Sequence, residues 1–330
     1  MVIKVKSPAN IAFIKYWGRR DETLVLPYNS SFSMNLSNCF VKLKIKIRED
    51  RKRRLFIKDF KANEYIEDTG KPLEKTLEFF ERVCRFFKTS NKAGFDVYSS
   101  LSFPRQAGIA SSAAYFSALA LGFCKILGKD VDKKTLSILA RLSGSGSAAR
   151  SVPDGFVLWR KGEDSLSCFA ESIAEPSYWD LVDIVLIISS KPKKTTSYSG
   201  HKNVETSSIF RERLEGVERR LQKMLRAFER KDLEYFGKLL EDEALSMHSV
   251  MMSQKPPLFY WSCATFDVMK KTVGLRSSGL PVFYTIDAGE NMHLITEGRY
   301  LKKTLEYLKS WQEVRYILVN NPCKGVCFDQ

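Results

Sequence analysis

Two short segments made almost entirely of serine, glycine and alanine constrain this chain more than any other feature. Gly108–Ala114 follows a strand-like segment and opens a run of small and apolar residues that ends at Gly128, which predicts a buried helix. Ser143–Ser151 follows a second predicted helix, Lys133–Leu142, and leads into a turn and a strand. The two segments therefore flank one helical pair within a pattern of mixed strands and helices.

The first segment has the composition of a phosphate-binding loop. Its small side chains allow backbone N–H groups to approach an anion, and the following helix adds the positive end of its dipole. It lacks the lysine of a Walker loop, so the hydroxyls of Ser111 and Ser112 are the candidates for contacting phosphate or Mg²⁺. A tight helix start among small residues explains the segment equally well.

The second segment, Gly144–Arg150, again offers hydroxyl and backbone N–H groups. It adds Arg150, whose planar guanidinium matches the oxygens of a phosphate. A flexible linker is the alternative. That alternative is weaker, because the segment is short and has hydrophobic patterns on both sides.

Two charged residues stand in apolar surroundings and are candidates for catalysis. Lys15 lies among aromatic and aliphatic residues, although a surface lysine lying over Tyr16 and Trp17 gives the same pattern. Asp287 follows an apolar strand and precedes glycine, where strand ends often expose catalytic groups. A turn or N-cap aspartate is equally compatible with that position.

The remaining pattern predicts an α+β protein in two parts. A chain of 330 residues exceeds the usual size of a single core, and the apolar strand at 181–189 marks the start of a second part, so we expect domains at 1–180 and 181–330. Periodicity predicts strands at 41–49, 53–60, 94–101 and 281–286, and helices at 72–87, 208–248 with a break near 231–232, and 265–273.

Composition excludes several classes of protein. Its 44% hydrophobic and 28% charged residues are typical of a globular protein, and no run of about 18 apolar residues indicates a membrane span. The N-terminus lacks the features of a signal peptide, so we expect a cytoplasmic protein. The cysteines form no CxxC pair and the histidines have no metal-ligand spacing, so no structural metal is expected; Cys323 and Cys327 are close enough in sequence to form a disulfide.

The net charge of +15 suits polyanionic ligands and would also suit nucleic acid. Two of the basic clusters, 42–54 and 211–231, have the periodicity of solvated strand and helix faces. A basic RNA-binding protein is therefore the rival from a different class, but it would leave Asp287 unexplained.

Taken together, these segments resemble the GHMP family of small-molecule kinases and, within it, the diphosphomevalonate decarboxylases. The resemblance rests on motifs in family order across nearly the whole chain: SPANIAFIKYWGRRDETLVLPYNSSFSMNLS, GIASSAA, GSGSAARS, VETSSIFRER, PPLFYWS and YTIDAG. It implies an N-terminal domain with a left-handed βαβ unit, a ferredoxin-like C-terminal domain and an active site in the cleft between them. It also implies ATP-dependent conversion of mevalonate 5-diphosphate to isopentenyl diphosphate, with Mg²⁺ as the metal.

The resemblance assigns roles to individual residues. Asp287 matches the catalytic aspartate and Lys15 the catalytic lysine. The positions that match the diphosphate-binding residues are Tyr16, Arg19, Ser145, Ser147, Arg150 and Ser197. The positions that match the ATP phosphate loop are Gly108, Ala110, Ser111 and Ser112, with Ser112 also assigned to Mg²⁺. The family is commonly dimeric, which implies a homodimer. We expect neither nucleic acid nor a membrane as a partner.

The sequence also departs from the family pattern. Arg19 stands where lysine is usual, Tyr198 where some members have arginine, and His201 where many have methionine. These changes lie among the residues expected to bind the diphosphate. Decarboxylation of mevalonate 5-phosphate, or phosphorylation of the 3-hydroxyl alone, therefore stays open as an alternative activity.

Overall fold

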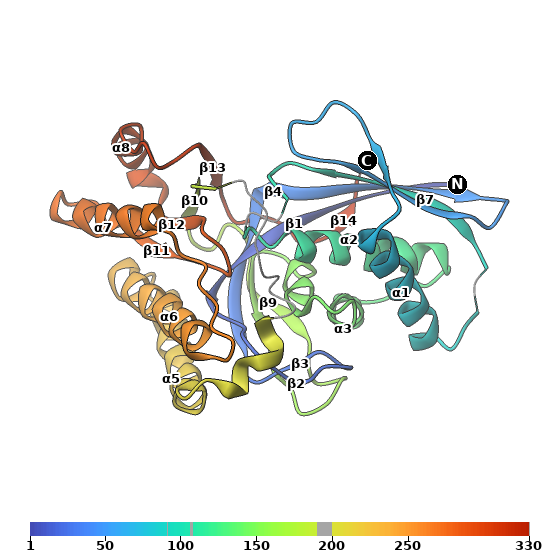
Figure 1. The fold of residues 1–330 in the computed structure, drawn as a ribbon, viewed down its shortest axis with the longest axis horizontal. Helices are drawn as coiled ribbons and strands as arrows, with labels where there is room; N and C mark the ends of the chain where they lie inside the picture. Colours follow the sequence, from blue (N-terminus) through green and yellow to red (C-terminus); the bar gives the residue numbers. More distant parts are fainter. Residues whose placement is uncertain (91, 106–107, 190–199, 330) are drawn as a thin grey trace.

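The computed structural model describes residues 1–90, 92–105, 108–189 and 200–329, and it contains two main sheets with helices packed against them (Figure 1). The strands are β1 Val2–Ile14, β2 Arg19–Asp21, β3 Leu26–Pro27, β4 Ser31–Arg48, β5 Arg53–Lys58, β6 Ile66–Asp68, β7 Gly94–Leu101, β8 Phe156–Trp159, β9 Ala170–Ala174, β10 Leu181–Ile187, β11 Phe283–Thr285, β12 Met292–Glu297, β13 Tyr316–Asn320 and β14 Cys327–Phe328.

The helices lie between these strands along the chain. The α-helices are α1 Lys71–Phe86, α2 Ser111–Ile126, α3 Lys133–Arg141, α5 Phe210–Glu229, α6 Leu233–Ser253, α7 Cys263–Ser277 and α8 Gly298–Leu308. Two 3₁₀ helices are η1 Gly146–Ser151 and η2 His201–Thr206. The predicted strands and helices are thus present, and most boundaries differ from the prediction by a few residues. The exception is the strand predicted at 41–49, because β4 begins at Ser31.

The first sheet is built on the two long strands β1 and β4, which run side by side across the molecule (Figure 1). Its order is β14-β1-β4-β7-β5-β6, with β8 and β9 joined at the first half of β4. In β4, Val41, Leu43 and Ile45 are buried whereas the lysines between them are exposed. The prediction that this basic stretch is a solvated strand face is confirmed.

Helices α1, α2 and α3 lie along one face of this sheet (Figure 1). The approach of α2 depends on Gly122, because a Cβ there would lie 2.5 Å from Ile45 Cδ1. Phe79, Phe80 and Phe123 fill the layer between the helices and the sheet. The aromatic stripe of the 72–87 helix is therefore core. This packing holds α2 against the sheet, and the first turn of α2 contains Ser111 and Ser112 of the predicted phosphate loop.

The second sheet has the order β11-β12-β10-β13 with every pairing antiparallel. With helices between β10 and β11 and between β12 and β13, this is a ferredoxin-like arrangement. Both faces of β10 are buried, which explains why its sequence is continuously apolar instead of alternating. The two-part α+β fold predicted from the sequence is confirmed.

Helices α5 and α6 connect the two parts. They pack against each other, and α6 contacts both β1 and β11. The C-terminal strand β14 returns to pair with β1 of the first sheet, so the last residues belong spatially to the N-terminal part. The boundary at residues 180 and 181 stays a prediction.

Two further expectations concern a disulfide and a membrane-spanning helix. All the cysteines are free thiols, so the Cys323–Cys327 disulfide that the sequence allowed is not formed. Across the described ranges, no helix has the length and apolarity needed to cross a membrane.

Candidate active site

The candidate catalytic pair joins the two parts of the fold. Lys15 immediately follows β1, and Asp287 lies two residues beyond the end of β11. The Lys15 Nζ atom lies 2.6 Å from Asp287 Oδ1, although the residues are 272 apart in sequence. The Lys15 side chain is 1% exposed and that of Asp287 is 21% exposed, so the carboxylate is the more accessible of the two.

The surroundings determine the charges of this pair. Burial lowers the pKa of Lys15, and the nearby carboxylates of Asp287 and Glu243 oppose that effect without cancelling it. Burial alone would raise the pKa of Asp287, but Lys15, His293 and Arg150 outweigh it and hold that pKa below its ordinary value. Asp287 is therefore ionised at neutral pH, as a general base must be before it accepts a proton.

The structure brings the two Ser/Gly segments together beside this pair. Ser112 Oγ lies 3.1 Å from Ser145 Oγ, which in turn lies 3.4 Å from Ser147 Oγ. Ser112 lies in the first turn of α2. Ser145 immediately precedes η1, and Ser147 lies within it. The row of hydroxyls is suited to binding phosphate oxygens from two different ligands.

Arg150, in η1, is 3% exposed and is held by residues of two strands of the first sheet. Its Nε donates to Asn10 Oδ1 of β1 at 3.0 Å, and its Nη1 donates to Ser31 Oγ of β4 at 3.0 Å. Burial lowers the pKa of Arg150 to about 10, so the guanidinium keeps its charge at neutral pH. Its position is therefore fixed before any ligand binds.

Arg19 lies in the same region, but its donors already have protein partners. The guanidinium donates to the Tyr16 hydroxyl at 2.8 Å and to the Gly144 carbonyl at 2.7 Å, and it pairs with Glu22 at 2.9 Å. Arg19 thus ties the first turn after β1 to the second Ser/Gly segment. Of these three partners Glu22 is the exposed one, with a side chain 43% accessible.

His201, which comes from the C-terminal part, contacts the same turn. Its Nδ1 accepts a hydrogen bond from the Gly18 N–H at 2.8 Å, and its ring stacks on Tyr16 with centroids 4.5 Å apart. Burial, together with the nearby cations Arg19 and Arg150, holds the pKa of His201 well below its usual value, so the ring is neutral. Ser197, the weakest of the predicted diphosphate contacts, lies outside the described residues.

The first Ser/Gly segment lies directly against the segment that carries Asp287. Gly108 has φ +85°, and a Cβ there would contact Gly289 Cα at 3.5 Å. Ala110 is the N-cap of α2 with φ 43°, and it has no side-chain cap, so the N–H groups of the first turn are not satisfied by a capping side chain. Ser111 and Ser112 follow at the start of the helix, as the sequence predicted.

No group of three or more His, Cys, Asp or Glu residues able to hold a metal occurs in the described part of the chain. A Mg²⁺ ion would instead be held by nucleotide phosphates, with the exposed hydroxyl of Ser112 as the protein oxygen. Mg²⁺ commonly binds in this way, because it favours oxygen ligands and is often carried by its phosphate substrate. The residues present therefore fit the ion.

The sequence interpretation missed several residues near the pair. Asn10 and Ser31 hold Arg150, while Glu243 and His248 of α6 contact the backbone of Lys15 and Asp287. Asn10 lies in the same N-terminal motif as Lys15, so proximity to that motif could have indicated it. Glu243 and His248 are polar positions on the buried side of a helix, a signal that does not identify their partners.

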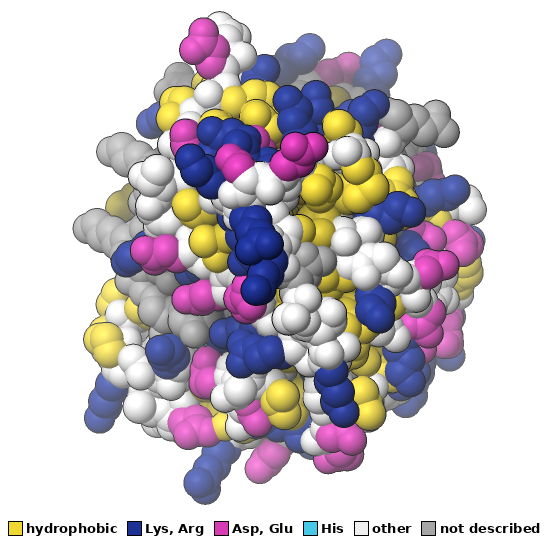
Figure 2. Space-filling view, turned by 90° about the vertical axis from the view of Figure 1, so that its right-hand side faces the viewer, with side chains coloured by type: hydrophobic (Ala, Val, Ile, Leu, Met, Phe, Trp, Pro, Cys, Tyr) yellow, Lys and Arg dark blue, Asp and Glu magenta, His cyan; other side chains and the backbone are white. Residues whose placement is uncertain are grey.

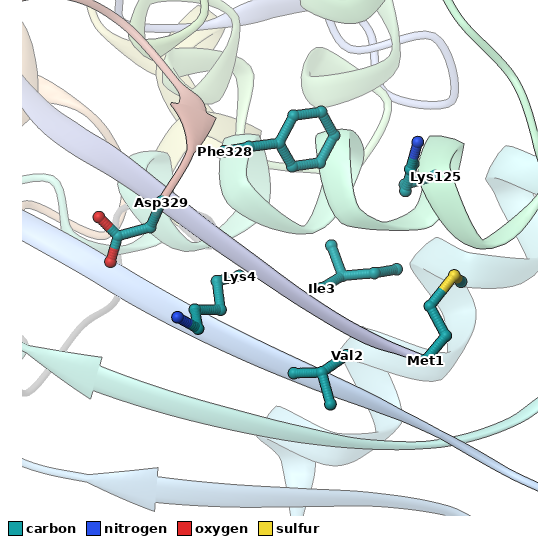
Figure 3. Close-up of a pocket in the computed structure, with 7 residues that line it drawn as sticks. All are labelled: Met1, Val2, Ile3, Lys4, Lys125, Phe328 and Asp329. Atoms are coloured by element: carbon teal, nitrogen blue, oxygen red, sulfur yellow. The ribbon is translucent and has the colours of Figure 1, made fainter.

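One pocket in the described part of the chain lies apart from the predicted site residues. A shallow pocket of about 280 Å³ lies between the start of β1 and the C-terminus, lined by Lys4, Lys125, Phe328 and neighbours (Figure 3). None of its lining residues belongs to the predicted site. Figure 2 shows Lys and Arg side chains on the end of the molecule that carries α1, interspersed with Asp and Glu and not gathered into one block.

The fold and the Lys15–Asp287 pair beside two phosphate-type loops define a GHMP-type protein. Residues 7–170 match the family described as diphosphomevalonate decarboxylase-like N-terminal domain, and residues 183–319 match mevalonate 5-diphosphate decarboxylase C-terminal domain. The chain belongs to the diphosphomevalonate decarboxylase family.

Individual relatives are similar to this chain over most of their own length. Diphosphomevalonate decarboxylase of Homo sapiens is 34% identical over 88% of this chain and 75% of its own, and that of Danio rerio is 32% identical over 93% and 79%. Mevalonate diphosphate decarboxylase from Staphylococcus aureus superposes with a TM-score of 0.91 at 28% identity, covering 100% of this chain and 99% of its own. A structure of MDDEF with MVAPP, AMPPCP and magnesium gives 0.90 at 30% identity, with the same coverage.

Proposed function

We propose that this protein converts mevalonate 5-diphosphate and ATP to isopentenyl diphosphate, ADP, phosphate and CO₂, with Mg²⁺ as the metal cofactor. The observation that carries the proposal is the Lys15–Asp287 pair, which is assembled from both parts of the fold beside two Ser/Gly segments. The relatives named diphosphomevalonate decarboxylase support the reaction. A related structure that holds MVAPP, an ATP analogue and magnesium supports the substrates and the metal.

Asp287 is the proposed base for the first step. Its ionised carboxylate accepts the proton of the tertiary 3-hydroxyl, the hydroxyl oxygen bonds to the γ-phosphorus of ATP, and the bond from phosphorus to the β-phosphate oxygen breaks to release ADP. Mg²⁺ supplies neutralisation of the phosphate charges. Lys15 orients the carboxylate through the 2.6 Å contact, and it keeps Asp287 ionised before the proton arrives.

The second step is elimination of the new phosphate with CO₂. The C3–O bond breaks and its electrons leave on phosphate, while the electrons of the bond to the carboxyl carbon form the alkene. The buried charges of Lys15 and Arg150 are placed to stabilise the departing phosphate. Because these cations are already fixed by the protein, little reorganisation is needed as charge develops.

The remaining residues bind and orient the two substrates. We assign the diphosphate to Tyr16, Arg19, Ser145, Ser147 and Arg150, with Ser197 as a further contact. We assign the ATP phosphates to Gly108, Ala110, Ser111 and Ser112, with Mg²⁺ next to Ser112. The 3.1 Å contact between Ser112 and Ser145 brings these two groups of residues together, which supports transfer between adjacent ligands.

The test is turnover with mevalonate, mevalonate 5-phosphate and mevalonate 5-diphosphate, each with ATP and Mg²⁺. We expect the diphosphate to give ADP, phosphate and CO₂ in equal amounts and at the highest kcat/KM. Preference for the monophosphate would replace the substrate in this proposal, and ADP without CO₂ would indicate a 3-kinase. No turnover with any of the three would contradict the enzyme assignment.

We also propose a cytoplasmic homodimer in which residues 1–180 and 181–330 form the two domains. The family resemblance supports the dimer. Light scattering of the purified protein tests the dimer directly, since a monomer mass of 37.8 kDa would contradict it.

A further inference from the structure

Helix α6 contacts the backbone of both members of the proposed catalytic pair. Glu243 accepts a hydrogen bond from the backbone N–H of Lys15 at 3.0 Å. Five residues further along the helix, His248 Nε2 lies 3.2 Å from the backbone carbonyl oxygen of Asp287. One rigid element therefore reaches a residue of the N-terminal part and a residue of the C-terminal part.

Glu243 is a fully buried carboxylate held by an unusual set of partners. Its Oε1 also accepts from Arg213 Nη2 at 2.5 Å, and its Oε2 accepts from Arg220 Nη1 at 2.6 Å. Both arginines come from α5, so the carboxylate cannot rotate without breaking a charged contact. Burying a charge costs stability unless it is paired, and here the pairing places one carboxylate oxygen against the backbone of Lys15.

His248 is fixed in a comparable way. Its ring stacks on Trp261 with centroids 4.3 Å apart and an interplanar angle of 30°. Burial, followed by the charge of Lys15, lowers the pKa of His248 to about 3, so the ring is neutral at working pH. Because a carbonyl can only accept, the nitrogen that faces Asp287 carries the proton and donates it.

We propose that α6 positions the catalytic pair across the two domains, with Glu243 holding Lys15 and His248 holding Asp287. Both are positioning residues, since neither reaches the reacting atoms. The geometry matters because a base and its cation must be placed within a fraction of an ångström for proton transfer, and small displacements cost large factors in rate. This inference rests on the roles proposed above for Lys15 and Asp287.

The chain offers a matched control for Glu243. Glu241 lies two residues earlier on α6 and also joins an arginine to a backbone N–H, since it accepts from Arg276 at 2.8 Å and from Tyr284 N at 3.2 Å. Glu241→Gln and Glu243→Gln therefore each remove one carboxylate charge from a paired position. Only Glu243 contacts Lys15.

We expect Glu243→Gln to lower kcat about tenfold or more, with the KM values for ATP and mevalonate 5-diphosphate within about twofold of wild type. Glu241→Gln should leave kcat within about twofold. A purely structural role would lower the melting temperature of both variants without separating their kcat values. Equal kcat for the two variants would overturn the proposal.

The pH profile gives a second readout for Glu243. The charged groups that face Lys15 are Asp287, Glu243 and Arg150. Glu243 raises the pKa of Lys15, so removing its charge lowers that pKa, and the alkaline limb of kcat should move to lower pH in Glu243→Gln. An alkaline limb that stays in place would contradict an action of Glu243 through Lys15.

His248→Phe keeps the proposal testable if Glu243→Gln fails to fold. Phenylalanine preserves the stacking on Trp261 but removes the donor to Asp287, so kcat should fall about tenfold while ATP binding, measured by calorimetry, is retained. Wild-type kcat in this variant would contradict the assignment. Asp287→Asn is measured alongside these variants. An inactive Asp287→Asn with fully active His248→Phe and Glu243→Gln overturns the positioning role alone, whereas an active Asp287→Asn overturns the base role proposed for Asp287, on which the positioning role rests.

Discussion

The two Ser/Gly segments have nearly the same composition but different structural states. In the second segment, Gly146–Ser151 forms a 3₁₀ helix whose Gly146 approaches Trp159 and Tyr16 so closely that a Cβ would lie 2.7 Å and 3.0 Å from their rings. At Gly108 the nearest atom to a Cβ would be 3.5 Å away, and Ser112 is exposed. The second segment is therefore packed into the protein before any ligand binds, while the first is an open helix start, to which we assign the nucleotide.

Neighbouring residues, and not composition, produce this difference. Arg150 anchors its segment to β1 and β4 through Asn10 and Ser31, and Arg19 adds a bond to Gly144. The nucleotide loop has no comparable anchor among its described residues, since Ala110 caps α2 without a side-chain bond. The second Ser/Gly segment, to which we assign the diphosphate, is therefore the more preorganised of the two.

The largest expected effect follows from removing the anchor of the rigid segment. Arg150→Lys keeps a positive charge but loses the bonds to Asn10 and Ser31, and leaving such buried groups unpaired costs about 1–3 kcal/mol each. We expect kcat/KM for mevalonate 5-diphosphate to fall about 100-fold, with the KM for ATP nearly unchanged. Steady-state kinetics with each substrate varied in turn measures both.

Arg141→Lys is the control for Arg150→Lys, because Arg141 is also buried and its Nη2 donates to Ser165, which is not among the predicted site residues. It should lower the melting temperature without raising the KM for mevalonate 5-diphosphate. Similar kinetic losses in both variants would mean that Arg150 acts only through stability.

Adding a methyl group to each segment tests their rigidity directly. Gly146→Ala overpacks the contact with Trp159 and Tyr16, which typically costs about 1–3 kcal/mol, whereas Gly108→Ala incurs about 1 kcal/mol of left-handed backbone strain. We expect the lower melting temperature in Gly146→Ala and the higher KM for ATP in Gly108→Ala. Thermal unfolding and kinetics that rank the variants in the opposite order would break the comparison.

The smallest effect is expected at the exposed hydroxyl. Ser112→Ala removes one exposed hydroxyl, which would donate a hydrogen bond to a phosphate oxygen or coordinate Mg²⁺. A hydrogen bond to a charged group contributes about 1.5 kcal/mol at the lower end of its range, so the KM for ATP should rise about tenfold. The KM for mevalonate 5-diphosphate should change less than twofold. Ser143→Ala, at a serine of the second Ser/Gly segment with no assigned ligand, is the control, and an equal rise there would contradict a specific role for Ser112.

The sequence predicted the local structure well because the signals are local. The alternation in β4, the stripe of α1, and the break between α5 and α6 near Lys231 all depend on residues a few positions apart. The boundary of α2 was equally readable, because small residues and Gly128 punctuate it.

Contacts between distant segments could not be predicted in this way. Lys15 and Asp287 were each ambiguous from the residues alone, and only the family resemblance placed them together. The roles of Glu243 and His248 depend on how α6 packs between two sheets, which no periodicity encodes. The internal partners of Arg19 were also missed, because an arginine in a motif for binding phosphate gives no sign that Tyr16 and Gly144 already occupy its donors.

The most direct test of the account is the rate of a single turnover in Asp287→Asn compared with wild type. Enzyme in excess is mixed with ATP, Mg²⁺ and mevalonate 5-diphosphate, and ADP and CO₂ are quantified over time, with ATP binding measured separately. The account predicts intact ATP binding and a loss of at least about 100-fold in the appearance of both products, because the amide cannot accept the proton of the 3-hydroxyl. ADP and CO₂ formed at the wild-type rate would contradict Asp287 as the base.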